Sequence, residues 1–281
     1  MILLTGGSGQ VGSQVKKLLD LNEIPYLSPT SKEFPLDNHL EIIHYLSINY
    51  FTTIIHLAAE TDVDFCEMNP NLAFERNSKS VAVIADYCVK NSKKVIYLSS
   101  SAVLSGGSSF LHPENSAYFP SNVYGASKMR GEIAILESPV EHLIIRASWM
   151  LGISTKGPKF AQIIYERISE GASVSAVFDK FGSLTSTKRL AEFIVKNLEF
   201  NKSGIVHVAS KTPCSRYEIA KFIANYLEKS VVVDSVSNED FKLPAPRGFS
   251  EGLQSENASG YYGYEALSWE DELMTFLKEI C

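Results

Sequence analysis

The start of the chain constrains its fold more than any other segment. An apolar run at residues 1–4 is followed by a helical pattern that begins at Gln10. The turn between them and the first helical turn contain Gly6, Gly7, Gly9 and Gly12. Glycine allows positive φ and a close approach of the backbone to a pyrophosphate, and a helix N-terminus offers free N–H groups to it. A GxGxxG pattern between a strand and a helix therefore predicts a dinucleotide site; the alternative is a purely structural turn.

Strand-like and helix-like segments alternate through the first half of the chain. The expected strands lie at 1–4, 24–27, 53–57, 94–98 and 142–147, and the expected helices at 10–22, 40–49, 71–91 and 123–136. Helices of this length between strands indicate βαβ units, and hence a parallel sheet covered on both faces. We expect a Rossmann-type, doubly wound α/β domain over residues 1–152, with the dinucleotide site at its first turn.

The pattern changes after Gly152. Helices are expected at 159–170, 187–200, 215–228 and 269–280, strands at 204–208 and 231–236, and a loop rich in Pro, Gly and Ser at 240–263. We expect residues 153–281 to form mainly a smaller α/β substrate-binding lobe over the carboxyl ends of the strands, where ligands of open α/β sheets bind. Some of its segments are expected to return to the Rossmann core.

Composition narrows the class of protein. Of the 281 residues, 45% are hydrophobic, and 26 basic residues against 32 acidic residues give a net charge of −6. The even spread of charge argues against nucleic-acid binding, and no apolar run reaches the ~18 residues of a membrane span. The apolar start of the chain lacks a basic leader, so we expect no signal peptide.

The cysteines show no sign of a redox or metal role. Cys66, Cys88, Cys214 and Cys281 form no CxxC pair and lie at no metal-ligand spacing from a histidine. We therefore expect reduced thiols in a cytoplasmic protein, and no metal site. A homodimer is compatible with the sequence, although its pattern does not separate interface helices from core helices.

The end of the second expected strand bears on the choice of dinucleotide. Enzymes that use NAD usually place an acid there to bind the ribose 2′-OH. This chain has hydroxyl residues ending in Ser31, followed by Lys32, and no acid before Glu33. Ser31 and Lys32 would suit a 2′-phosphate, so NADPH is predicted; NADH bound through neutral contacts is the alternative.

A tyrosine and a lysine stand one helical turn apart. Tyr124 and Lys128 leave the same face of the helix expected at 123–136. A nearby ammonium and the positive nicotinamide of an oxidised cofactor favour the phenolate, which lowers the pKa of Tyr124 toward working pH. Tyr124 can then give a proton to an oxygen that receives hydride. The alternative is an ordinary surface pair, but its position after the fourth strand favours catalysis.

A run of serines ends that fourth strand. A hydroxyl at this place would hydrogen-bond the substrate carbonyl and orient it. Chemistry alone leaves open which of Ser99, Ser100 and Ser101 does so.

Together these motifs resemble the extended short-chain dehydrogenase/reductase superfamily and, within it, most closely the dTDP-4-dehydrorhamnose reductase family. The similarity covers nearly the whole chain. It is carried by the glycine turn, the serine run and the Tyr-Lys pair, and by the segments 58–64, 145–149, 179–185 and 245–247 with Glu67, Asn77 and Trp269.

The resemblance implies roles for individual residues. Ser100 would be the catalytic hydroxyl, Tyr124 the proton donor, and Lys128 both the partner of Tyr124 and a cofactor contact. Further cofactor contacts are implied at Gly6, Gly9, Gln10, Val11, Gly12, Ala58, Ala59, Asn77 and Ser99. Substrate contacts are implied at Val63, Ser100, Ser101, Trp149 and Arg247. Arg247 also has a physical rationale, since a guanidinium fork matches a diphosphate; a surface ion pair is the alternative.

The implied reaction is the NAD(P)H-dependent reduction of a 4-keto-deoxyhexose nucleotide, with Tyr124 protonating the oxygen. One alternative is a sugar-nucleotide epimerase with tightly bound NAD(P), which would consume no added NADPH. Another is a non-catalytic regulatory subunit of the methionine adenosyltransferase type.

Departures from the family pattern fall in the expected sugar pocket. The family's Thr-Asp-Tyr is replaced by serines and Ala102, which looks more like epimerases. Glu60, Leu184 and Gly248 replace an aromatic residue and two prolines of the family pattern. The sequence therefore selects neither the sugar nor its nucleotide.

Overall fold

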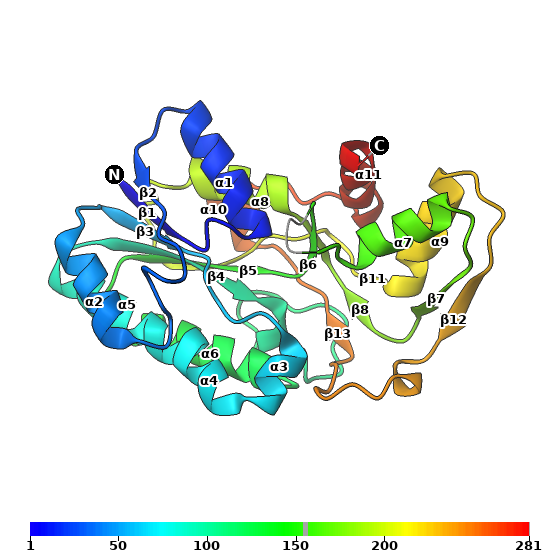
Figure 1. Ribbon diagram of the computed structural model, residues 1–281, viewed down its shortest axis with the longest axis horizontal. Helices are drawn as coiled ribbons and strands as arrows, with labels where there is room; N and C mark the ends of the chain where they lie inside the picture. Colours follow the sequence, from blue (N-terminus) through cyan, green and yellow to red (C-terminus); the bar gives the residue numbers. More distant parts are fainter. Residues whose placement is uncertain (154–156, 281) are drawn as a thin grey trace.

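The computed structural model describes residues 1–153 and 157–280, so Cys281, expected to be a reduced thiol, lies outside the described residues. Within these ranges the largest feature is a parallel six-stranded sheet in the order β10-β5-β4-β3-β1-β2 (Figure 1). Its strands are β1 (Ile2–Thr5), β2 (Tyr26–Leu27), β3 (Thr53–His56), β4 (Lys94–Ser100), β5 (His142–Ala147) and β10 (Gly204–His207). The predicted doubly wound α/β fold with a parallel sheet is confirmed.

Apolar runs form the central strands because both faces of the sheet are covered. All residues of β1 and β5 are buried. In the register, Ile96 of β4 lies between Ile55 of β3 and Leu143 of β5. The chain runs from β1 to β2 on one side and then crosses back to β3 on the other side of β1, so the strand order reverses at β1. Ligands of such sheets bind at the carboxyl ends of the strands beside this reversal.

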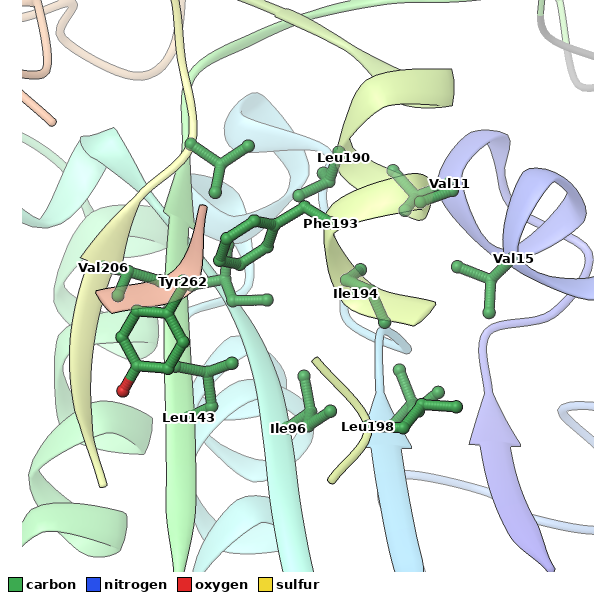
Figure 2. Close-up of a cluster of buried hydrophobic side chains, with 14 of the residues drawn as sticks. Val11, Val15, Ile96, Leu143, Leu190, Phe193, Ile194, Leu198, Val206 and Tyr262 are labelled. Carbon is green, nitrogen blue, oxygen red and sulfur yellow. The ribbon is translucent and has the colours of Figure 1, made fainter. Parts of the chain in front are cut away.

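Helices cover both faces of the sheet (Figure 1). On one face lie α1 (Gln10–Leu21), α8 (Thr187–Lys196) and α10 (Asn257–Tyr262). On the other lie α2 (His39–Ile48), α5 (Ser80–Lys90) and α6 (Val123–Leu136). Figure 2 shows the first core, where Val15 of α1 and Phe193 of α8 lie over Ile96, Leu143 and Val206 of the sheet. The C-terminal half thus contributes β10 and α8 to the layers around the central sheet.

The remaining C-terminal elements form a smaller cluster with a separate core. It contains α7 (Phe160–Ser169), α9 (Arg216–Tyr226) and α11 (Trp269–Ile280), with the paired strands β7 (Val174–Val177) and β12 (Val233–Val236). Short strands connect it to the central sheet layer: β6 (Trp149–Leu151) with β9 (Leu184–Ser186), and β11 (Cys214–Ser215), β8 (Phe181–Gly182) and β13 (Ser250–Glu251). The division of the chain at residue 152 stays a prediction.

Several segments differ from the sequence expectation, including the strands β6 to β9 and β11, which no pattern indicated. The helix expected at 71–91 is interrupted: α4 (Pro70–Phe74) and α5 are joined by a π-helical turn at Glu75–Lys79, and α3 (Val63–Met68) precedes them. The loop expected at 240–263 contains β13 and α10, and single turns of 3-10 helix occur at Ser101–Val103 and Asn238–Asp240. These elements are short and held by distant contacts; the Tyr262 ring of α10, for example, packs edge-on against Phe193.

Among the described helices, none combines the length and hydropathy that crossing a bilayer requires. Across residues 1–153 and 157–280, no group of three or more His, Cys, Asp and Glu side chains is arranged to hold a metal ion.

Candidate active site

Two positions at the β1–α1 turn have room for glycine only. Gly6 has φ +71°, and a Cβ at this position would lie 2.7 Å from the backbone nitrogen of Ala58. A Cβ on Gly12 would lie 2.2 Å from the carbonyl oxygen of Gly6. Gly9 is the N-cap of α1 and provides no side-chain cap, so the first N–H groups of the helix keep their donor capacity for a ligand. These features fit the pyrophosphate of a dinucleotide.

A cavity of about 980 Å³ runs from this turn across the carboxyl ends of the strands into the smaller cluster. The predicted site residues that line it are Gly6, Gly9, Gln10, Val11, Gly12, Ser31, Ala58, Ala59, Ser99, Ser100, Tyr124, Lys128 and Trp149. Lys32, Val63, Asn77, Ser101 and Arg247 were also predicted as contacts but are not among the lining residues.

The three predicted catalytic residues meet where β4 ends and α6 begins. Ser100 is the last residue of β4, and its hydroxyl oxygen accepts a hydrogen bond from Ala102 N at 3.2 Å. Asn122 caps α6 by accepting from Gly125 N at 2.9 Å, which fixes Tyr124 in the first turn. Lys128, one turn later, donates from Nζ to the Leu98 carbonyl oxygen at 2.8 Å.

The surroundings set the protonation of this pair. Burial raises the pKa of Tyr124 to about 12, against a smaller lowering by a hydrogen bond from Ser100. The lowering predicted for Tyr124 is therefore outweighed, within the protein itself, by desolvation of the phenolate. Burial lowers the pKa of Lys128 to about 7, while the charge of Glu132 acts in the opposite direction. Tyr124 is thus a protonated phenol at neutral pH, and Lys128 titrates near neutrality.

Glu132 continues the Tyr124–Lys128 face by one more turn and anchors it. Arg146 of β5 donates to it from Nη2 to Oε2 at 2.8 Å and from Nε to Oε1 at 3.0 Å and Oε2 at 3.2 Å. Tyr118 donates to Oε2 at 2.7 Å, and Ser99 donates to Oε1. Arg146 is 1% exposed and Glu132 is fully buried. The hydroxyl of Ser99, predicted to contact cofactor, therefore holds this buried pair.

Asn77 positions the loop that follows β3. From the π-helical turn, its Oδ1 accepts from Glu60 N at 2.8 Å and its Nδ2 donates to the Glu60 carbonyl at 2.9 Å. The same amide nitrogen donates to Ser127 Oγ of α6 at 3.0 Å. Asn77 thus fixes the backbone beside Ala59, which lines the cavity, against the helix of Tyr124.

Two predicted substrate contacts are engaged within the protein. Ser101 is fully buried and donates from Oγ to Glu251 Oε2 at 2.8 Å. Arg247 donates from Nη2 to Asp64 Oδ1 at 3.0 Å and from Nη1 to the Ala245 carbonyl at 2.8 Å. Their direct contact with a substrate stays a prediction.

Comparison with known proteins identifies the family. The RmlD substrate binding domain profile matches residues 1–281. The chain belongs to this family. It is 27% identical over 293 residues to the dTDP-4-dehydrorhamnose reductase of Salmonella typhimurium, covering 99% of this chain and 97% of that protein.

Solved structures of the family share the fold over nearly the whole chain. The dTDP-4-dehydrorhamnose reductase of Yersinia enterocolitica is 32% identical, with a TM-score of 0.94 over 100% of this chain and 99% of that chain. The Bacillus anthracis dTDP-4-dehydrorhamnose reductase, in complex with NADP, is 29% identical, with a TM-score of 0.90 over 99% and 98% of the two chains. The predicted resemblance to extended short-chain dehydrogenases/reductases of this kind is confirmed.

Sequence reasoning missed four cations that line the cavity: Lys16, Arg76, Lys159 and Arg216. Arg76 is held by Asp37 and Glu60, with Nη to carboxylate distances of 2.7 and 3.0 Å. Lys16 on α1 could have been suspected, because it lies one turn beyond the glycines. Arg216 had no local signal, since it reaches the cavity only through the packing of the smaller cluster.

Proposed function

We propose that this chain catalyses the NADPH-dependent reduction of the keto group of a 4-keto-deoxyhexose nucleotide. The observation that carries the proposal is that Ser100, Tyr124 and Lys128 converge at the carboxyl end of β4 in the same cavity as the glycine turn. A dinucleotide on that turn and a ketone beside Tyr124 would then share one enclosed space. The relatives with dTDP-4-dehydrorhamnose reductase names support this substrate class.

The chain's own residues supply the proton and the orientation. NADPH, when bound, supplies the hydride. Tyr124 donates its phenolic proton to the substrate oxygen as negative charge develops there, and its raised pKa keeps that proton in place beforehand. The Ser100 hydroxyl holds the same oxygen. Lys128, fixed by the Leu98 carbonyl, provides a positive charge that stabilises the phenolate left behind.

The adenosine end of the cavity suits NADPH. The first acid in the sequence after β2 is Glu33. Its carboxylate accepts a hydrogen bond from Thr30 N at 2.8 Å and so stabilises a local turn. A Cβ added at Gly7 would lie 2.1 Å from Ser28 Oγ and 3.3 Å from Lys16 Cδ, so both side chains lie close to this glycine. A hydroxyl and an ammonium at this place match a 2′-phosphate. The complex of the Bacillus anthracis relative with NADP is consistent with this choice.

We also propose a cytoplasmic location. Three of the cysteines, Cys66, Cys88 and Cys214, are free and buried, and burial raises the pKa of Cys66 and Cys88 to about 12. Such unreactive thiols are typical of reducing compartments.

The test is the loss of NADPH absorbance with purified protein and a panel of 4-keto-6-deoxyhexose nucleotides that carry thymidine, uridine or guanosine. We expect consumption with one member, dependent on both protein and sugar nucleotide. Binding of NADPH without consumption for any member of the panel would contradict the proposed reaction and favour an epimerase or a regulatory protein.

A further inference from the structure

Arg216 is a cation held inside the cavity by aromatic rings. It is the first residue of α9, and its guanidinium carbon lies 4.6 Å from the ring centroid of Trp149 and 4.5 Å from that of Phe160. All three residues line the cavity. Stacking of this kind covers the faces of the planar guanidinium and leaves the N–H groups at its edge as donors.

Arg216 has no carboxylate in salt-bridge contact among the described residues. Across residues 1–153 and 157–280, Arg216 forms no ion pair and donates no hydrogen bond, whereas the buried Arg146 is paired with Glu132. The charge of Glu251 acts on Arg216, but its carboxylate accepts a hydrogen bond from Ser101. Arg247 adds a second positive charge nearby. Arg216 is half-buried, and its edge N–H groups stay available to an anionic ligand in the cavity.

The surroundings of Arg216 place it on the substrate side. Its ring contacts come from β6 and α7 of the C-terminal half, and Glu251 touches Ser101, the neighbour of the catalytic Ser100. The cofactor's pyrophosphate has a separate set of donors in the uncapped start of α1. The sequence suggested Arg247 as the contact of the substrate diphosphate. In the structure Arg247 instead forms an ion pair with Asp64.

We propose that Arg216 binds the diphosphate of the nucleotide-sugar substrate, with its edge donors paired to phosphate oxygens. This inference rests on the proposed function for its substrate class. A planar fork presents parallel N–H donors that match two oxygens of one oxyanion, which a lysine at the same place would not. Trp149 and Phe160 keep the fork in one orientation, so the diphosphate sets where the sugar lies relative to Tyr124.

The test measures binding rather than turnover. Thymidine, uridine and guanosine diphosphates, and the corresponding nucleosides, are titrated into NADPH-loaded protein by calorimetry. The variants are Arg216→Gln, Arg216→Lys and Arg247→Gln, with Arg167→Gln, an exposed arginine of α7, as the matched control. Thermal midpoints report whether each variant is folded.

We expect Arg216→Gln to weaken the binding of the preferred nucleoside diphosphate roughly 10- to 100-fold, because a charged hydrogen-bond donor is lost. Arg216→Lys should recover part of this loss, and NADPH affinity and the control should be unchanged. The inference is overturned by wild-type affinity in Arg216→Gln, by an equal loss for NADPH, by a larger loss in Arg247→Gln, or by a wild-type protein that binds no nucleoside diphosphate. Because no turnover is needed, failure of the reductase reaction would be seen separately.

Discussion

At the scale of single residues, the proton and the positive charge of the site belong to different side chains: Tyr124 carries the proton and Lys128 the charge. Burial keeps Tyr124 protonated, since the phenolate would be poorly solvated there. Lys128 is only 2% exposed and would lose its proton easily, but the Leu98 carbonyl and the charge of Glu132 favour the ammonium. The proton donor and its electrostatic partner therefore have different sensitivities to pH.

Replacement of the phenol tests the proton donor. We expect Tyr124→Phe to lower kcat by roughly 10²–10⁴-fold, the usual contribution of a general acid. NADPH affinity should be preserved, because the dinucleotide turn is untouched. Steady-state kinetics and a direct NADPH titration measure the two effects; undiminished turnover would refute the role of Tyr124.

The pH dependence follows from Lys128. Its pKa is lowered to about 7, and the charged form is the one that stabilises the phenolate. The active form therefore exists below this pKa, and kcat/KM should fall as pH rises through about 7, well before Tyr124 titrates at about 12. A pH profile of kcat/KM reports the groups of the free enzyme. In Lys128→Met the remaining activity should lose this limb, and a wild-type profile flat through neutral and alkaline pH would contradict the assignment.

Selectivity for NADPH distinguishes two lysines. Lys16 lines the cavity beside Ser28, whereas Lys32, chosen from sequence, is exposed and outside the lining. We expect Lys16→Gln to lower the NADPH/NADH ratio of kcat/KM by about 10-fold or more, the effect of one charge-assisted hydrogen bond to phosphate. Lys32→Gln serves as the matched variant and should change the ratio less. A larger effect of Lys32→Gln than of Lys16→Gln would show that Lys32, not Lys16, binds the 2′-phosphate.

At the scale of elements, a buried ion pair joins the strand and the helix on which catalysis depends. Arg146 in β5 and Glu132 in α6 are tied by hydrogen bonds of 2.8–3.2 Å. Glu132→Gln would leave the buried guanidinium without its counter-charge, at a cost of about 3–5 kcal/mol in the free energy of unfolding. Glu137→Gln, an exposed change near the end of the same helix, is the control. Urea unfolding measures both; equal midpoints would show that the pair contributes little.

Elements set by local pattern could be predicted from the sequence. The helices Val123–Leu136 and Trp269–Ile280 and the strand His142–Ala147 have the predicted bounds, because apolar periodicity and chain length decide them. The two-residue strands such as β8 and β11 have no such signal, since each exists only through its partners. The same holds for α10, which depends on the packing of Tyr262.

The candidate site divides in the same way. Tyr124, Lys128 and the glycine turn were found because their spacing is local in sequence. Glu132 continues the same helical face and could have been found by extending that spacing. Arg216 could not, because only folding brings it to the ring of Trp149, far away in the sequence.

At the scale of the whole molecule, the cavity is positively charged although the chain as a whole is negatively charged. The chain carries a net charge of −6. The cavity is nevertheless lined by the cations Lys16, Arg76, Lys128, Lys159 and Arg216 against only Asp37 and Glu60 among the described acids. Both acids are paired with Arg76, so the other four cations face the cavity without a carboxylate partner of their own. A positively charged cavity in a negatively charged protein focuses the electric field and attracts anionic ligands to the site.

Salt should therefore slow the capture of ligands. NADPH and a nucleotide sugar are both polyanions, and the Debye length shrinks from ~30 Å at 0.01 M to ~3 Å at 1 M salt. We expect the association rate of NADPH, followed by stopped-flow fluorescence, to fall by roughly 10-fold or more over this range. An uncharged nucleoside should show little change, which separates field screening from a general effect of salt on the fold. Lys159→Gln removes one cation at the start of α7 and should flatten the salt dependence; an association rate independent of salt would mean that the cavity cations act only by contact.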